Sequence, residues 1–203
     1  MLSKKTYLST FGLVTFFLLS GCSSLKNNVA VTEPQDGDRA RVRVVMSNSK
    51  NLYKGVRAYP NSTCVSLNVP GNGMVTNPMG MAGGFEKSLN GKTLGMPLDN
   101  TYQKNSKFVT AEFYAAAGQP ITLAYTRPPV YETIRQDIIS ETKVVTKPAC
   151  DIKKTLTPQS GQDYQIVFDE KNQCDFSSYQ YDLKTGQATL NAITLPTAIT
   201  CKK

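Results

Sequence analysis

The feature that most constrains the fold is an alternation of apolar and polar residues that recurs along the chain. In residues 39–44 (RARVRV) the odd positions are arginine and the even positions are apolar, which is the period of a strand with one buried face. Residues 107–115 (KFVTAEFYA) and 121–125 (ITLAY) alternate similarly. Strands of this kind form antiparallel sheets. Several of them separated by turns predict an all-β fold, an antiparallel β-sandwich that is Ig-like or similar.

Turn-forming residues indicate how the predicted strands pair. Residues 157–161 (TPQSG) and 184–186 (KTG) each stand between two alternating runs. This arrangement predicts β-hairpins over residues 150–168 and 176–195. Residues 128–147 fit less well, because their isoleucines are spaced four apart as on a helix. We expect a short helix or a long connection there.

The composition excludes several classes of function. The 203 residues include no histidine, which is the commonest general base and metal ligand. Adjoining carboxylates such as Asp169 and Glu170 would point to opposite faces of a strand. We therefore expect no enzymatic activity and no cofactor. The formal net charge is +8, but aromatic residues do not interleave with the basic ones, so nucleic acid is not an expected partner.

Residues 1–21 have the organisation of a secretory signal peptide. Lys4 and Lys5 precede an apolar run over residues 11–19, much shorter than the roughly 20 residues of a membrane-spanning helix. The run ends in Leu19-Ser20-Gly21-Cys22, which resembles the lipobox of bacterial lipoproteins. The resemblance implies cleavage before Cys22 and acylation of that residue at its sulfur and amine. Two or more acyl chains anchor a protein stably.

The residue after the cysteine indicates the destination within this family. It is Ser23, where lipoproteins kept in the inner membrane of enteric bacteria carry Asp. The resemblance therefore implies a lipid anchor in the outer membrane, on its periplasmic side, with the inner membrane and the cell surface as alternatives. Residues 22–38 are polar and predict a flexible tether. Residues 39–203 would then form a single β-sandwich domain.

Four cysteines remain once Cys22 is assigned to the lipid. An even number in an exported protein indicates disulfide bonds, and the gaps between these cysteines are too long for the close pairs of a zinc site. Four cysteines permit three pairings. We favour Cys64–Cys150 together with Cys174–Cys201, because this pairing closes two separate loops.

Residues 70–97 are rich in glycine and methionine and are expected to form one long loop. Long loops in a compact domain are commonly functional, so Met79, Met81 and Phe85 are candidates for partner binding. Thioethers also suit Cu(I). The alternative metal site would draw on Met74, Met79, Met81 and Met96. Methionine in such a loop also fills gaps in packing.

Arg39, Arg41 and Arg43 are expected to project from one face of the first strand, about 6.7 Å apart. Such a row could bind phosphates or carboxylates of a partner, or it could keep an edge strand from unwanted pairing. Together, these features predict a membrane-anchored binding or envelope-assembly module whose partner is an envelope protein or a glycan. A Cu(I)-handling protein and an immunity or inhibitor lipoprotein remain alternatives.

Overall fold

The computed structural model is all-β, as the alternation predicts. It describes residues 29–47, 55–77, 87–135, 141–168, 174–182 and 188–202. Across those ranges no helix occurs that is long and apolar enough to cross a membrane. Cys22 and the preceding residues 1–21 lie outside the described residues.

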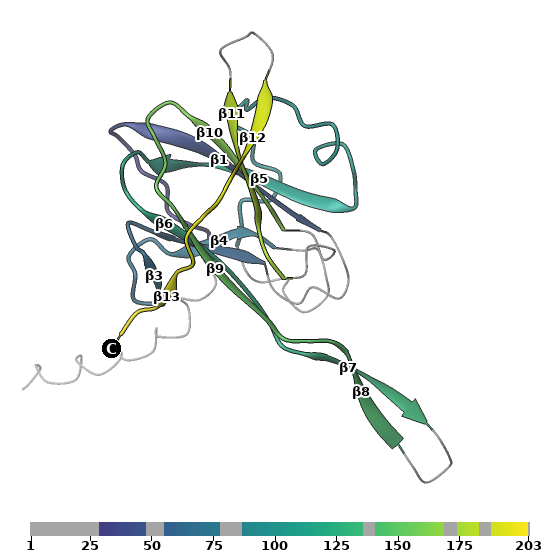
Figure 1. Ribbon diagram of the computed structural model, residues 1–203. Helices are drawn as coiled ribbons and strands as arrows, with labels where there is room; N and C mark the ends of the chain where they lie inside the picture. Colours follow the sequence, from purple (N-terminus) through teal and green to yellow (C-terminus); the bar gives the residue numbers. More distant parts are fainter. Residues whose placement is uncertain are drawn as a thin grey trace, which may run out of the picture.

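Two main sheets form the body of the protein (Figure 1). In spatial order, the five-stranded sheet consists of β12 (Thr189–Ile193), β11 (Ser177–Asp182), β10 (Asp163–Phe168), β1 (Arg39–Ser47) and β5 (Phe108–Ala116). The four-stranded sheet consists of β4 (Gly73–Thr76), β2 (Val56–Pro60), β6 (Ile121–Arg127) and β9 (Cys150–Leu156). Two short ladders pair β3 (Cys64–Val65) with β13 (Ile199–Thr200), and β7 (Val130–Arg135) with β8 (Glu141–Lys147).

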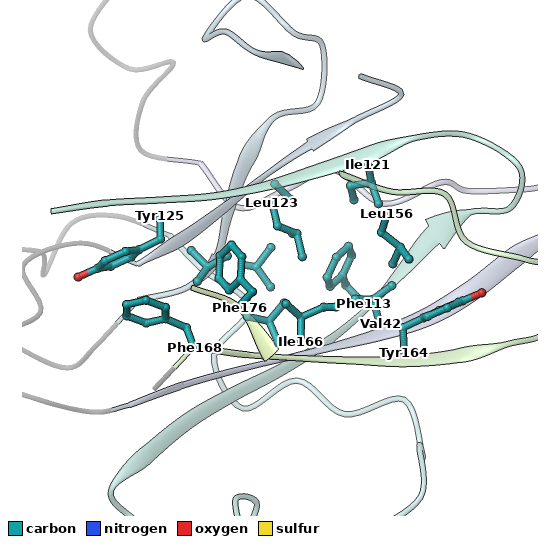
Figure 2. Packing of buried hydrophobic residues seen from close by; sticks show 14 of the residues in the cluster. Val42, Phe113, Ile121, Leu123, Tyr125, Leu156, Tyr164, Ile166, Phe168 and Phe176 are labelled. Atoms are coloured by element: carbon teal, nitrogen blue, oxygen red, sulfur yellow. The ribbon is translucent and has the colours of Figure 1, made fainter. Parts of the chain in front are cut away.

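The hydrophobic core lies between the two main sheets (Figure 2). Val42 and Val44 are fully buried in it, as the alternation of residues 39–44 predicts. Val42 of β1 aligns with Phe113 of β5 and Tyr164 of β10. The opposite layer contributes apolar residues of β6 and β9. The inward faces of β1, β5, β6 and β10 are therefore those that the alternation predicts.

The strand order departs from a purely antiparallel sandwich. Most ladders are antiparallel, but β1 pairs with β10 in parallel, as does β3 with β13. Because β10 lies beside β1, β9 and β10 belong to different sheets, and the predicted hairpin over residues 150–168 is wrong. Residues 157–162 instead cross from one layer to the other. The predicted hairpin over residues 176–195 is confirmed as β11 and β12.

The described parts of residues 128–147, which are 128–135 and 141–147, contain neither the short helix nor the long connection that we expected. They include β7 and β8, which pair antiparallel with a register shift between Val130 and Tyr131. Figure 1 shows this hairpin continuing β6 and β9 away from the body as an arm. The isoleucine spacing was misleading because the Thr- and Val-rich composition of the stretch favours strands.

Part of the expected tether, residues 22–38, belongs to the folded body. Residues 29–32 lie along β4, with backbone hydrogen bonds from Val31 to Met74 and from Met74 to Val29. Val31 is buried. The approach is so close that a Cβ on Gly73 would lie 2.3 Å from the carbonyl carbon of Ala30. The folded body therefore begins before residue 39.

The two predicted disulfides are present, but the favoured pairing is wrong. Cys64 is bonded to Cys201, which joins the β3–β13 region to the C-terminal end of the chain. Cys150 is bonded to Cys174, which links the first residue of β9 to the segment that leads into β11. The second bond thus connects the two main sheets.

The β6–β9 ladder explains why Cys64 and Cys150 do not meet. Cys150 pairs with Arg127 at one end of that ladder. Cys64 follows Pro60, which pairs with Ile121 at the other end. Six steps along a strand span about 20 Å, which is far beyond the Cα separation that a disulfide allows.

Candidate functional site

A row of polar side chains crosses the outer face of the five-stranded sheet, the face turned away from the core. Strand pairing places Glu112 of β5 opposite Arg43 of β1. On its other side, Arg43 is opposite Gln165 of β10. Gln165 is in turn opposite Tyr179 of β11. Four neighbouring strands therefore bring polar groups into one line, although the strands are far apart in the sequence.

Arg43 lies at the centre of this row, and its side chain is fully buried. Its Nε and Nη2 lie 2.9 Å and 2.5 Å from Oε1 of Glu112. Its Nη1 donates to Gln165 Oε1 at 3.0 Å and to the Tyr181 hydroxyl at 2.8 Å. Tyr181 donates to the same Gln165 oxygen at 2.9 Å. A buried charge is tolerated when it is paired and hydrogen-bonded, and these three partners satisfy that condition.

Residues 87–105, which we term the covering segment, shield the row from water. The N–H of Gly91 donates to Thr110 of β5, so the segment first follows the edge of the sheet. The backbone N–H groups of Leu94 and Met96 then both donate to Oε2 of Glu112. Oε1 of the carboxylate therefore binds Arg43 and also accepts from the Gln103 amide of the covering segment at 3.4 Å, while Oε2 binds the backbone of that segment.

Arg41 also binds the covering segment. It lies two residues before Arg43 on the same face of β1. Its Nε and Nη2 donate to the two carboxylate oxygens of Asp163, each at 2.7 Å. Its Nη1 donates to the carbonyl oxygens of Leu94 and Gly95, each at 3.1 Å. The hydrogen bond to Asp163 raises the pKa of Arg41, so the guanidinium remains charged. Two arginine–carboxylate pairs thus fix the covering segment to the sheet.

An open pocket of about 330 Å³ lies where the covering segment meets β11 and β12. Its polar and aromatic lining includes Asp99, Tyr102, Gln165, Tyr179 and Tyr181. Leu98 and Leu190 also line it, and both are exposed, by 72% and 40%. The floor is continuous with the buried row, because Gln165 donates to Asp99 Oδ2 at 2.7 Å. The pocket is therefore polar at its base and apolar at its margin.

The strand beside the pocket, β12, is the edge of the five-stranded sheet. Within the described ranges, no residue pairs with its outer side. Residues 189–192 are exposed and carry no charge. Leu190 pairs with Tyr181, so the strand edge adjoins the pocket. We refer to the pocket and the outer edge of β12 together as the β12 surface.

The arginine row predicted from sequence has a different role from the one expected. The first strand is internal to its sheet and is not an edge. Arg43 is fully buried and cannot reach a partner. Arg41 is occupied by Asp163 and the covering segment. The guanidinium of Arg39 lies 4.5 Å from the centre of the Tyr114 ring. The three side chains do share one face, as predicted, but that face is covered.

The predicted Gly- and Met-rich loop is also different in the structure. Gly73–Thr76 of that stretch form β4, and Met74 and Met96 are buried. Met74 belongs to the four-stranded sheet, whereas Met96 lies against Glu112 on the outer face of the other sheet. The structure therefore does not bring these two sulfurs together. Met79, Met81 and Phe85 lie outside the described residues.

Metal-ligating side chains do not gather elsewhere in the described ranges. Within them, no group of three or more Cys, Asp or Glu side chains has the arrangement of a metal site. A second cavity of about 260 Å³ lies between residues 31–34 and the loop after β5. Its one carboxylate, Glu33, is paired with Lys92 and accepts a hydrogen bond from the N–H of Tyr114. The acidic group of that cavity is therefore already paired, which makes the cavity a weaker candidate site than the β12 surface.

Sequence analysis missed Asp99, Glu112, Gln165 and Tyr181. Glu112 occupies a polar position of its alternating run, and such a position is normally interpreted as solvated. The only available signal was that an acidic residue in one run could oppose an arginine in another. Periodicity does not reveal which strands pair, so this signal could not be used.

Tyr181 makes the stability of this site sensitive to alkaline pH. Burial raises the pKa of Tyr181, the charges of Asp99 and Glu112 add to the increase, and Arg43 opposes it. The folded protein therefore holds the phenolic proton more tightly than the unfolded chain, and stability falls as pH rises above about 10.

We expect Tyr181→Phe to reduce that slope when the free energy of unfolding is measured between pH 8 and pH 11. The slope should not vanish, because burial raises the pKa of Tyr59 as well. Tyr131→Phe, at an exposed position of the arm, is the control. Equal slopes for the Tyr181 variant and the unmodified protein would contradict the assignment.

The β12 surface and the row beneath it are the most developed polar arrangement in the described part of the chain. They combine a buried ion-pair scaffold, an open pocket and an unpaired strand edge. No protein-family model, curated protein or solved structure matches this chain.

Proposed function

We propose that this chain is a lipid-anchored envelope protein that binds a partner protein through the β12 surface. The observation that carries the proposal is the outer edge of β12. An unpaired and uncharged edge strand exposes a row of backbone N–H and C=O groups, and an extended segment can pair with them. Most proteins protect such edges with charge or proline, and residues 189–192 have neither.

The surroundings of β12 support binding of a partner protein. Leu98 and Leu190 at the margin of the pocket are exposed, and apolar side chains around a pocket favour association. Beneath them, the Arg43–Glu112 pair and its hydrogen bonds hold the sheet and the covering segment in one arrangement. A rigid base of this kind lowers the entropy lost on binding.

Binding is favoured over catalysis by the way the acidic groups are used. Glu112 and Asp163 are each paired with an arginine and are almost completely buried, so neither is exposed to a substrate. The chain has no histidine to act as a base. The β12 surface thus offers recognition groups without an activated nucleophile beside them.

The anchor is the part of the proposal that rests on residues 1–22. Leu19-Ser20-Gly21-Cys22 after a short apolar run supports acylation of Cys22, and Ser23 supports an outer-membrane location facing the periplasm. We expect the native protein to lack residues 1–21 and to carry lipid on Cys22 by mass spectrometry. Cys22→Ser should remove the protein from the membrane fraction. Membrane retention of that variant would contradict the anchor without affecting the assignment of the β12 surface.

Site-specific photo-crosslinking in intact cells tests the binding surface. A photoreactive amino acid replaces Leu190 in one variant and Leu67 in the control, since both leucines are exposed, by 40% and 49%. We expect one adduct of constant mass, identified by mass spectrometry, from position 190 and none from position 67. Adducts from both positions, or from neither, would show that β12 is not the binding surface.

A further inference from the structure

We propose that the pocket of the β12 surface receives a lysine or arginine side chain from a partner segment that pairs in extended form with β12. The inference rests on the proposed function and specifies the chemistry of the partner. It is carried by three independent features: the charge of the pocket, its aromatic lining and its position beside an unpaired strand.

The charge of the pocket is negative. Asp99 is the one charged side chain among the described residues that line it. Its Oδ2 accepts from the Gln165 amide at 2.7 Å, and its Oδ1 accepts from the N–H of Thr101 at 2.9 Å. Both donors are neutral, so they orient the carboxylate without cancelling its charge. The nearby Arg43 is already compensated by Glu112 at 2.5 Å.

The aromatic lining suits a cation as well. Tyr102, Tyr179 and Tyr181 all contribute to the pocket, and ammonium and guanidinium groups are attracted to the faces of such rings. The fold already uses this contact, because the Arg43 guanidinium lies 5.9 Å from the centre of the Tyr181 ring. A second cation from outside would meet a carboxylate and aromatic rings together.

The position of the pocket matches a strand added to β12. A partner strand would lie about 4.8 Å beyond β12, with every second side chain on the outer face of the sheet. Leu190 and Tyr181 are directly paired and both line the pocket. A partner residue opposite Leu190 on that face would therefore extend over Asp99 and the tyrosines. Its basic group would pair with the Asp99 carboxylate, which forms no ion pair with a cation of the described residues.

The closing experiment uses full-length protein in detergent micelles and two synthetic peptides. Both have the extended design acetyl-Thr-Val-X-Val-Thr-amide, where X is lysine in one and norleucine, its neutral analogue, in the other. Binding is followed by chemical-shift changes in isotope-labelled protein. We expect the lysine peptide to bind about tenfold more tightly, equivalent to about 1.4 kcal/mol, with shifts at residues 188–193 and 99–102. The ratio should fall at high salt, because screening weakens partly exposed charge pairs.

Asp99→Asn is the decisive variant. Asparagine keeps one acceptor oxygen for the N–H of Thr101 but loses the hydrogen bond from Gln165. Unchanged chemical shifts outside the pocket therefore have to accompany the result, to show that the fold is kept while the charge is removed. We expect the two peptides to bind this variant equally. Asp175→Asn is the control, because Asp175 is exposed and paired with Lys154 away from the pocket; it should preserve the tenfold ratio.

Several results would overturn the inference. These are equal binding of both peptides to the unmodified protein, a ratio that is insensitive to salt, or preference for lysine that survives Asp99→Asn. Binding of N-acetylglucosamine at the same resonances without either peptide binding would assign the pocket to a neutral glycan instead. In the first three cases a crosslink at position 190 would leave the proposed function standing, so the two failures can be distinguished.

Discussion

Arg43→Met should lower the free energy of unfolding by about 3–5 kcal/mol, because it leaves the buried Glu112 carboxylate without its cation. Glu112 is 1% exposed and cannot recover that charge interaction from water. Two backbone N–H groups of the covering segment would remain its main donors. Urea denaturation followed by far-ultraviolet circular dichroism measures the change.

The matched control for this prediction is Lys154→Met. Its partner Asp175 has a side chain that is 56% exposed, so water can solvate the remaining carboxylate, and the loss of stability should be clearly smaller. The double variant Arg43→Met with Glu112→Leu should recover most of the lost stability, because apolar residues often replace a whole buried ion pair without penalty. Additive losses in the double variant would show that the two side chains do not act as a pair.

Replacing Cys64 and Cys201 by serine should have an effect of similar size. The bond closes a loop with a sequence separation of 137 residues, and the chain-entropy model assigns about 5 kcal/mol to such a loop. Replacing Cys150 and Cys174, which are separated by 24 residues, should cost about 3.5 kcal/mol by the same model. Urea denaturation of both double variants gives the order of the losses.

Peptide mapping under non-reducing conditions provides the check on this prediction. We expect linked fragments containing Cys64 with Cys201 and Cys150 with Cys174. A fragment joining Cys64 to Cys150 would contradict the pairing and the loop lengths on which the two values depend. A reversed order of stability with the correct fragments would contradict the entropic explanation alone.

The strands of the inner core could be predicted because their evidence is local. Val42 and Phe113 are apolar positions of alternating runs, and both are fully buried. The β11–β12 hairpin was also accessible, since its strands are separated by a short turn-forming segment. The arm formed by β7 and β8 was not, because its isoleucine spacing suggested a helix while pairing between its two halves stabilises strands.

The candidate site could not be assembled from the sequence. Asp99 lies in the covering segment, Gln165 in β10 and Tyr181 in β11, so their meeting depends on strand order and on the path of an irregular segment. Alternation placed Arg43 on the correct face but assigned that face to solvent. Nothing in the local pattern shows that a segment some 50 residues later folds over it.

Sequence by itself determined which side of the core strands is apolar, and with it the all-β character of the protein. The physical reason is that side chains alternate along any extended backbone, whatever surrounds it. Tertiary structure alone decided that Arg43 is buried, which cysteines are bonded and where Asp99 meets the tyrosines. Those outcomes depend on contacts between residues distant in the chain, and such contacts exist only once the sheets have paired and the covering segment has closed over them.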